Sequence, residues 1–365
     1  MLEIKGRKST AICYSKTIRD RAVMDIRAIC DHDFTENRRI RIMPDVHPNG
    51  DGTVTGFTMT LGEPLVLGLE YPSGCGVSCA KINAAVLDLP KLDQVCRQFP
   101  ASRDEFLIVP AFDYDFSVLR CYEHVRPYYL WPTSLGTLGG GNHFIELDRD
   151  DEGGLYLVVH NGLGRLGSPV LRHYRDLALR KSGKVGGEVE LEDTFLFGQD
   201  MEDYIHDMDI IVDACRKNRR YIIDSIISDM GWKELDFFDT CHHCISKEDG
   251  VIRHGAVSAH KGERVIIPVN AKDGTILGTG KGNEEWNYSA PHGGGRVYSR
   301  SEAFENLDIE GYRSSMDGIY STSVSEVNLD EAPLAYKRMD EILQTIEDSV
   351  DVQRILKPVF NYKGE

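Results

Sequence analysis

The stretch LYLVVH, residues 155–160, shows the pattern that decides the fold class: a short apolar run that ends at a polar, potentially reactive residue. Short apolar runs bounded by glycine or proline are typical of buried β-strands. Three further runs have this character, and we expect strands there too: Arg39 to Met43, Leu65 to Leu69 and Val265 to Val269. Each expected strand leads into a loop that carries reactive side chains.

Two other segments have the spacing of amphipathic helices. Apolar residues recur at intervals of three and four from Met201 to Ile226, and Gly231 provides a stop. A similar pattern predicts a second helix from Pro333 to Val350. Strands and helices that alternate along the chain predict an α/β or α+β fold. Without an internal repeat or a long linker, we expect one domain over residues 1–365.

Composition limits the classes of function. The net charge of -16 and the pI of about 5.2 exclude a protein that binds nucleic acid through a general positive charge, so any such contact requires a local basic groove. No apolar run is long enough to span a membrane, and MLEIKGRKST lacks the apolar core of a signal peptide. We therefore expect a cytoplasmic protein without membrane contact. Nine cysteines, an odd number, favour reduced thiols over a disulfide framework.

Several histidines and one cysteine lie at the ends of expected strands or in glycine-rich loops, where a scaffold presents side chains to a cleft. Imidazole and thiolate together suit divalent transition ions such as Zn, Mn, Fe or Co. A single histidine is more often a hydrogen-bonded structural residue than a ligand, so this pattern alone leaves both interpretations open. The candidates are Cys75, His47, His143, His160, His242 and His243.

The stretch WNYSAPHGGGRVYSR, residues 286–300, places His292 before three glycines and Arg296. A histidine nitrogen can attack phosphorus and hold a nucleotidyl group covalently, provided that nearby donors stabilise the displaced charge. The backbone N–H groups of the glycines and the fork of an arginine are such donors. The alternative is a glycine turn followed by a surface arginine.

In their order along the chain, these motifs resemble the RtcB family of GTP-dependent RNA ligases, which join RNA 3′-phosphate or 2′,3′-cyclic phosphate ends to 5′-hydroxyl ends. The resemblance implies a single RtcB-like domain whose sheets surround a central metal and nucleotide cleft. The matching segments are MPDVH at 43–47, CGV at 75–77, LGGGNHFIE at 138–146, His160, YIH at 204–206, RKNR at 216–219, His242-His243, Arg253, Gly255-Ala256, HGGGR at 292–296, SRS at 299–301 and YKG at 362–364.

The resemblance also implies roles for individual residues. His292 matches the family's guanylylated histidine, and Arg296 with the three glycines matches the phosphate cradle beside it. Lys363 matches a near-terminal lysine that contacts the nucleotide. The other implied nucleotide-binding residues are Asn142, Glu146, Ser289, Gly293, Gly294 and Gly295. The implied manganese ligands are Cys75, which would bridge two ions, His143, His160 and His243, the last because the family's ligand takes the second place of the histidine pair.

The chain departs from the family pattern at several positions. Pro72 stands where the family has an aspartate ligand, and proline cannot bind a metal, so the second ion lacks one family ligand. Glu70 is the alternative carboxylate nearby. The remaining departures are Gly294 for alanine, His254 for lysine, Cys244 for asparagine, and Arg165 displaced along its motif.

The resemblance thus predicts an RNA ligase of the RNA-repair or tRNA-splicing type that uses GTP, manganese and a GMP-histidine intermediate. It implies a monomer, acting on RNA ends with or without an activating protein; the sequence leaves DNA ends open as an alternative substrate. Two other hypotheses fit the same residues: a metal-dependent phosphodiesterase that processes ends, and a non-catalytic relative that binds RNA ends or nucleotide.

Overall fold

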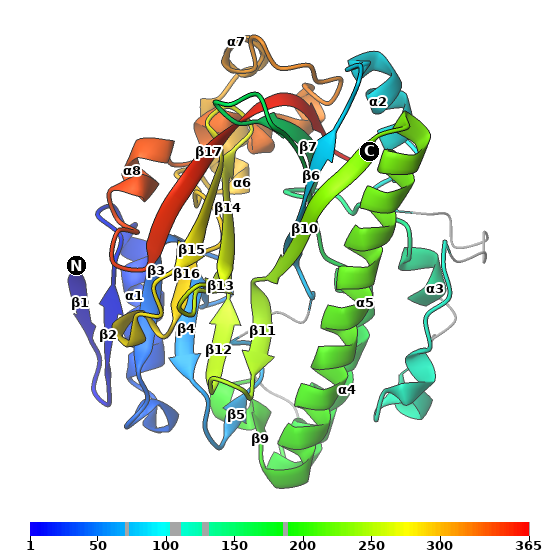
Figure 1. Ribbon diagram of the computed structural model, residues 1–365. Helices are drawn as coiled ribbons and strands as arrows, with labels where there is room; N and C mark the ends of the chain where they lie inside the picture. Colours follow the sequence, from blue (N-terminus) through cyan, green and yellow to red (C-terminus); the bar gives the residue numbers. More distant parts are fainter. Residues whose placement is uncertain (70–72, 103–110, 126–130, 185–188, 365) are drawn as a thin grey trace.

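The computed structural model describes residues 1–69, 73–102, 111–125, 131–184 and 189–364 of the chain (Figure 1). Glu70 and Pro72 lie outside the described residues. Helices and sheets are mixed throughout, which confirms the predicted fold class. Nearly all strand pairs are antiparallel, so the architecture is of the α+β kind.

The larger sheet has seven strands, all paired antiparallel. Strand β8 lies inside it with every residue buried, because both faces of the sheet are covered. Strand β17 joins two halves of this sheet and ends beside β7. In spatial order the strands are β10 (Lys233–Cys241), β6 (Gly76–Asn83), β8 (Leu155–Asn161), β7 (Phe144–Arg149), β17 (Val350–Tyr362), β15 (Gly274–Gly280) and β14 (Arg264–Asn270).

The second sheet has six strands and one parallel pair, β2 with β3. Two small sheets complete the described strands: β13 (Ala256–Ser258) with β16 (Ser289–Pro291), and β5 (Leu65–Val66) with β9 (Phe195–Leu196). The order in the six-stranded sheet is β1 (Leu2–Lys5), β2 (Thr10–Cys13), β3 (Ile40–Pro48), β4 (Val54–Thr60), β12 (Val251–His254) and β11 (His243–Ser246).

The longest helix, α5 (Gly198–Met230), runs beside β10 and β6 and contacts β8 and β11 as well (Figure 1). It confirms the helix expected from Met201 to Ile226, and Gly231 ends it with a φ of 68°, a conformation that glycine adopts without steric cost. The other α-helices are α1 (Asp20–Cys30), α2 (Leu89–Cys96), α3 (Trp131–Ser134), α4 (Gly164–Ser182), α6 (Arg300–Asn306), α7 (Ile309–Ser315) and α8 (Met339–Leu343).

The four expected strands are present as β3, β5, β8 and β14, although β5 is shorter than expected. The helix predicted from Pro333 to Val350 is wrong: only α8 is α-helical there, and Val350 begins β17. Tertiary contacts override the periodicity, because Tyr336 forms an extended bridge with Arg296 and the Lys337 ammonium donates to Ser15 Oγ at 2.9 Å and to the Pro44 carbonyl at 2.7 Å.

Within the described ranges, no helix combines the length and the apolar character that crossing a bilayer requires.

Candidate active site

A cavity of about 810 Å³ collects most of the residues expected to act. Strand ends from both large sheets and the loop after β16 form its walls. Of the expected site residues, Ser289 is the exception: its buried hydroxyl donates to the Asn287 carbonyl at 2.7 Å and accepts from Arg253 Nε at 3.0 Å. The expected residues that line the cavity are Cys75, Asn142, His143, Glu146, His160, His243, His292, Gly293, Gly294, Gly295, Arg296 and Lys363.

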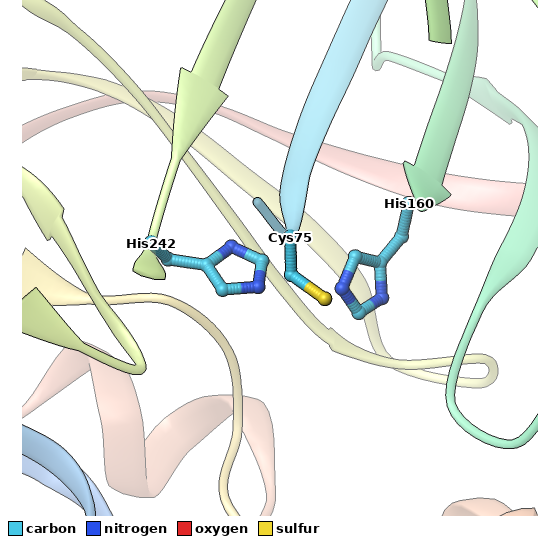
Figure 2. Close-up of side chains that lie close together, drawn as sticks. All are labelled: Cys75, His160 and His242. Carbon is cyan, nitrogen blue, oxygen red and sulfur yellow. The ribbon is translucent and has the colours of Figure 1, made fainter. Parts of the chain in front are cut away.

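Three metal-binding side chains converge on one wall of the cavity. The ligand atoms of Cys75, His160 and His242 all lie within 4.8 Å of one another, and Figure 2 shows the thiol between the two imidazole rings. Cys75 directly precedes β6, His160 lies near the end of β8, and His242 follows β10. Because β6 pairs with both β8 and β10, their ends bring the three side chains together.

Hydrogen bonds and burial leave nitrogen lone pairs of the metal-binding histidines free to bind an ion. The His160 Nδ1–H donates to the Asn142 carbonyl at 3.2 Å, which leaves Nε2 as a lone-pair donor, and Nε2 is buried with no hydrogen-bond partner among the described residues. His143 Nε2 lies 3.6 Å from Cys75 Sγ and can supply a fourth ligand. Burial lowers the pKa of His143 to about 4 and that of His160 well below its usual range, so both rings are neutral near pH 7.

The structure places His242 with Cys75 and His160, whereas the resemblance favours His243. The backbone N–H of His242 donates to the Cys75 carbonyl at 3.0 Å, which holds this residue beside the thiol. His243 begins β11 in register with His254, and their rings lie 4.8 Å apart. The difference arises because the chain bends at His242, between the two strands.

Buried side chains of α5 hold the metal-binding loops in place. Arg219 Nη1 donates to the Gly74 carbonyl at 3.1 Å and to the Asn161 carbonyl at 2.9 Å, next to Cys75 and His160 respectively. Burial opposes the charge of Arg219, but its ion pair with Asp239, at 2.7 Å, keeps the pKa above its usual value. The guanidinium therefore fixes both loops as a permanent cation.

A buried aspartate orients His292. Asp45 Oδ2 lies 2.6 Å from His292 Nδ1 and also accepts from the His292 backbone N–H at 3.1 Å. An imidazole that donates Nδ1–H to a carboxylate presents Nε2 as the free nucleophile. The ring lies 4.7 Å from that of His242, centroid to centroid, so the His292 ring lies next to the metal-binding group.

The glycines after His292 permit close packing. A Cβ on Gly294 would lie 2.4 Å from the Val269 carbonyl oxygen, and one on Gly295 would lie 2.2 Å from that of Asp45. Gly295 also has a φ of +73°. The Gly293 N–H donates to Asp45 at 3.3 Å, so that donor is already engaged. Alanine, the family residue at position 294, would therefore require this backbone to shift.

Arg296 is held by internal partners rather than presented freely. Its guanidinium donates to the Tyr336 hydroxyl at 2.8 Å, to Glu331 at 3.2 Å, and to the carbonyls of Tyr298, at 3.0 Å, and Asp330. This differs from the expected phosphate-binding fork. The arginine fixes the loop that follows His292, because its bonds tie that loop to residues 330–336.

Glu331 binds several cationic groups at the cavity wall. It accepts from Arg300 at 2.8 Å, from Lys363 at 3.2 Å and from the Tyr336 hydroxyl at 2.7 Å, besides Arg296. Burial alone would raise the pKa of Glu331, but Lys363, Arg300 and Arg296 hold it well below its usual range. Lys363 reaches this carboxylate because β17 ends beside β7, and it also donates to the Gly141 carbonyl at 3.3 Å.

Replacing Glu331 with glutamine is expected to destabilise the protein by about 3–5 kcal/mol, because buried cations lose their counter-charge. A carboxylate with a depressed pKa contributes its stability above the unfolded-state pKa and loses it as the pH falls through the folded-state pKa, so the full loss is expected at pH 7. Denaturant unfolding at pH 7 measures it. Glu305→Gln, on an exposed glutamate, is the control, and equal stabilities of the two variants would contradict this role.

Glu146 forms the inner wall of the cavity. It is buried, accepts from Asn361 Nδ2 at 2.8 Å, and burial raises its pKa to about 7. Asn142 is exposed and lines the same cavity. A carboxyl group with such a pKa can accept from, or donate to, the polar edge of a nucleobase.

Sequence reasoning missed two contributors to this site, Asp45 and Glu331, and gave a third, His47, no role. Asp45 lies within the quoted MPDVH segment, where a charged residue between apolar neighbours was a usable signal. Glu331 is one of several acidic residues in its segment, so no pattern distinguishes it. His47, a sequence candidate without an assigned role, lines the cavity, and burial lowers its pKa to about 4.

Comparison with known proteins gives consistent matches. A family model described as "tRNA-splicing ligase RtcB" matches residues 124–364. The chain is similar to the RNA-splicing ligase RtcB of Escherichia coli K12, at 26% identity over 90% of each chain. It is also similar to the tRNA-splicing ligase RtcB of Archaeoglobus fulgidus, at 25% identity over 84% of this chain and 83% of the relative. A homologue from Entamoeba histolytica is 26% identical over 63% of this chain and 54% of its own length.

Proposed function

The chain belongs to the RtcB family, and we propose that it is an RNA ligase that joins RNA 3′-phosphate or 2′,3′-cyclic phosphate ends to 5′-hydroxyl ends, using GTP and a divalent metal. Residues 1–365 act in this proposal as one ligase unit. The function fits the chemistry of the cavity, which combines a candidate nucleophile, a metal-binding group and cationic side chains.

One observation carries the proposal: His292 is held by the buried carboxylate of Asp45 at 2.6 Å, and its ring lies beside that of His242 in the metal-binding group. A glycine turn with a surface arginine would not need a buried carboxylate behind the histidine. This arrangement instead matches the needs of covalent catalysis, in which a second group fixes the tautomer of the nucleophile.

In the first step, His292 Nε2 attacks the α-phosphorus of GTP. A nitrogen–phosphorus bond forms, the bond to the β-phosphate oxygen breaks, and pyrophosphate leaves. Nδ1 keeps its proton throughout and donates it in a hydrogen bond to Asp45, whose negative charge stabilises the positive charge that develops on the ring. Lys363, Asn142 and Glu146 would hold the nucleotide against the inner wall.

In the second step, an RNA 3′-phosphate oxygen attacks the phosphorus of the bound GMP and releases His292. The 5′-hydroxyl of the other RNA then attacks the 3′-phosphate, and GMP departs as the phosphodiester forms. A cyclic phosphate must first be opened by hydrolysis. Each transfer requires the reacting groups in line, which the fixed walls of the cavity favour.

The residues present fit a divalent metal. The buried Nε2 of His160 without a partner, the Cys75 thiol and the His242 ring would hold it, with His143 as a fourth ligand. When bound, the ion neutralises phosphate charge and favours in-line attack. We propose Mn²⁺; because sulfur and nitrogen are softer ligands than this ion prefers, geometry and supply would select it.

Joining of two labelled RNAs tests the function. A 3′-phosphate RNA and a 5′-hydroxyl RNA, incubated with the protein, GTP and Mn²⁺, are expected to give a nuclease-sensitive product of combined length. No product is expected without GTP. Opening of a cyclic phosphate without GTP and without joining would instead support the phosphodiesterase, and RNA binding without either reaction would support a non-catalytic relative.

A further inference from the structure

Helix α4 is strongly basic in an acidic protein. Between Gly164 and Ser182 it carries five basic side chains and a single carboxylate, whereas the whole chain has a net charge of -16. The carboxylate is Asp176. A local excess of positive charge on one helix is the electrostatic footprint that nucleic-acid binding requires in such a protein.

These basic side chains are exposed and unused within the fold. Lys181 pairs with Asp200, but the four arginines make no ion pair or hydrogen bond with any residue that the structure describes. Arg165, Arg172 and Arg180 are spaced by seven and eight residues, about two helical turns each, so they share one stripe of the helix. The four arginines are Arg165, Arg172, Arg175 and Arg180.

A groove of about 300 Å³ lies against this stripe. Arg172 and Arg180 line it, and so does Asp176, the single carboxylate of the helix. His124 and His173 also line it, and their rings stack at 5.2 Å between centroids with an interplanar angle of 7°. Guanidinium groups bind phosphates, and imidazole rings offer flat surfaces on which bases stack. We call this groove, whose charged and imidazole side chains are Arg172, Arg180, Asp176, His124 and His173, the α4 groove.

The helix connects the α4 groove to the cavity. Gly164, at the start of α4, lines the cavity, and the exposed Arg165 follows it directly. From Arg165 to Arg180 the helix rises about 22 Å, which corresponds to several nucleotides of an extended strand. In Figure 1, α4 lies beside the lower part of α5, against which it packs.

We propose that the basic stripe of α4 binds the sugar-phosphate backbone of a single-stranded RNA and guides its end into the cavity. This rests on the proposed ligase function, and it assigns to that function a binding surface remote from the reacting groups. The RNA phosphates would pair with Arg172 and Arg180, and a base would stack beside His124. Charge complementarity favours RNA over an acidic protein, because the spaced arginines repeat along a line as backbone phosphates do.

Charge reversal tests the surface. In the double variant Arg172→Glu/Arg180→Glu, the dissociation constant for a fluorescent single-stranded 20-nucleotide RNA is expected to rise roughly tenfold or more. The slope of log K against log salt is expected to fall by about 1.4, at about 0.7 for each lost phosphate contact. The control, Lys5→Glu/Arg27→Glu, makes the same charge change at exposed residues of β1 and α1 and is expected to bind like the wild type.

The reaction itself separates this proposal from the proposed function. Covalent labelling by GTP needs no RNA and is expected to be unchanged in the α4 variant. The KM for a 20-nucleotide donor is expected to rise, while that for a 4-nucleotide donor stays unchanged. A wild type that takes no label refutes the ligase function but leaves the RNA-binding measurement valid.

Two results would overturn the proposal. The first is equal RNA affinity and equal salt slope for the α4 variant and its control. The second is retained RNA binding with loss of binding to polyglutamate, which would assign the helix to an acidic protein. Arg172→Gln/Arg180→Gln, which removes charge without adding repulsion, repeats the test if the reversed variant does not fold.

Discussion

Alanine at position 292 is expected to abolish the covalent label that the wild-type protein acquires from α-labelled GTP and Mn²⁺. The label would be a phosphoramidate on Nε2, and the methyl group of alanine cannot form one. The loss is expected to be complete, because alanine has no nitrogen that could attack the phosphorus. Denaturing electrophoresis followed by acid treatment measures it, since a phosphoramidate is lost in acid.

Asp45→Asn extends this test to the group that orients the nucleophile. Asparagine keeps the size of the side chain but removes the negative charge 2.6 Å from His292 Nδ1. We expect the labelling rate to fall by up to roughly 10⁴-fold, the loss that follows when the carboxylate that fixes the tautomer of a catalytic histidine becomes an amide. Time courses of labelling at saturating GTP would show the variant as slow rather than inactive.

The matched control is His260→Ala. His260 is partly exposed, and its Nε2 lies 3.0 Å from Asp249, so it too belongs to an Asp–His pair, but it lines a different cavity. Normal labelling of this variant is expected. Persistent labelling of His292→Ala would place the nucleophile elsewhere, and an unlabelled wild type with intact fold and metal would favour the phosphodiesterase or binding alternatives.

Hydrophobic periodicity in the sequence correctly predicted the long helix and the buried strands. The helix from Met201 to Ile226 is long enough for its periodicity to outweigh any single contact, and the apolar run before His160 is a fully buried strand. The segment after Pro333 has similar periodicity but folds differently, because the Lys337 ammonium donates to the carbonyl groups of Thr17 and Pro44 in the N-terminal part of the chain. Such contacts join residues about 300 positions apart and leave no local signal.

Some residues of the candidate site could likewise be predicted from the sequence, and others could not. His292 and Cys75 could be selected because their neighbours are unusual for a surface loop. Lys363 was found only through the family resemblance, since its position depends on the pairing of β17 with β7. Glu331 could not be found, because its role arises from three cations supplied by distant segments.

The second large effect is expected on metal affinity, and it distinguishes His242 from His243. If His242 is the ligand, His242→Ala is expected to lower metal affinity by more than the 10–100-fold typical for loss of an outer-shell partner. His243→Ala is expected to retain the metal, because its ring packs against His254 and its ligand atoms are not within 4.8 Å of those of both Cys75 and His160. Equilibrium dialysis against Mn²⁺, with bound metal measured by mass spectrometry, compares the two.

The two variants are matched controls for each other, since each removes one buried imidazole from adjacent positions with a similar loss of packing. Far-UV circular dichroism would confirm that both fold. RNA joining is expected to follow metal content, with His242→Ala inactive. Metal loss in His243→Ala alone would show that His243 is the ligand, as the family resemblance implies. The chain near His242 would then bend differently in the metal-bound protein. Loss in both would mean that the adjacent histidines serve two ions, despite the proline at position 72.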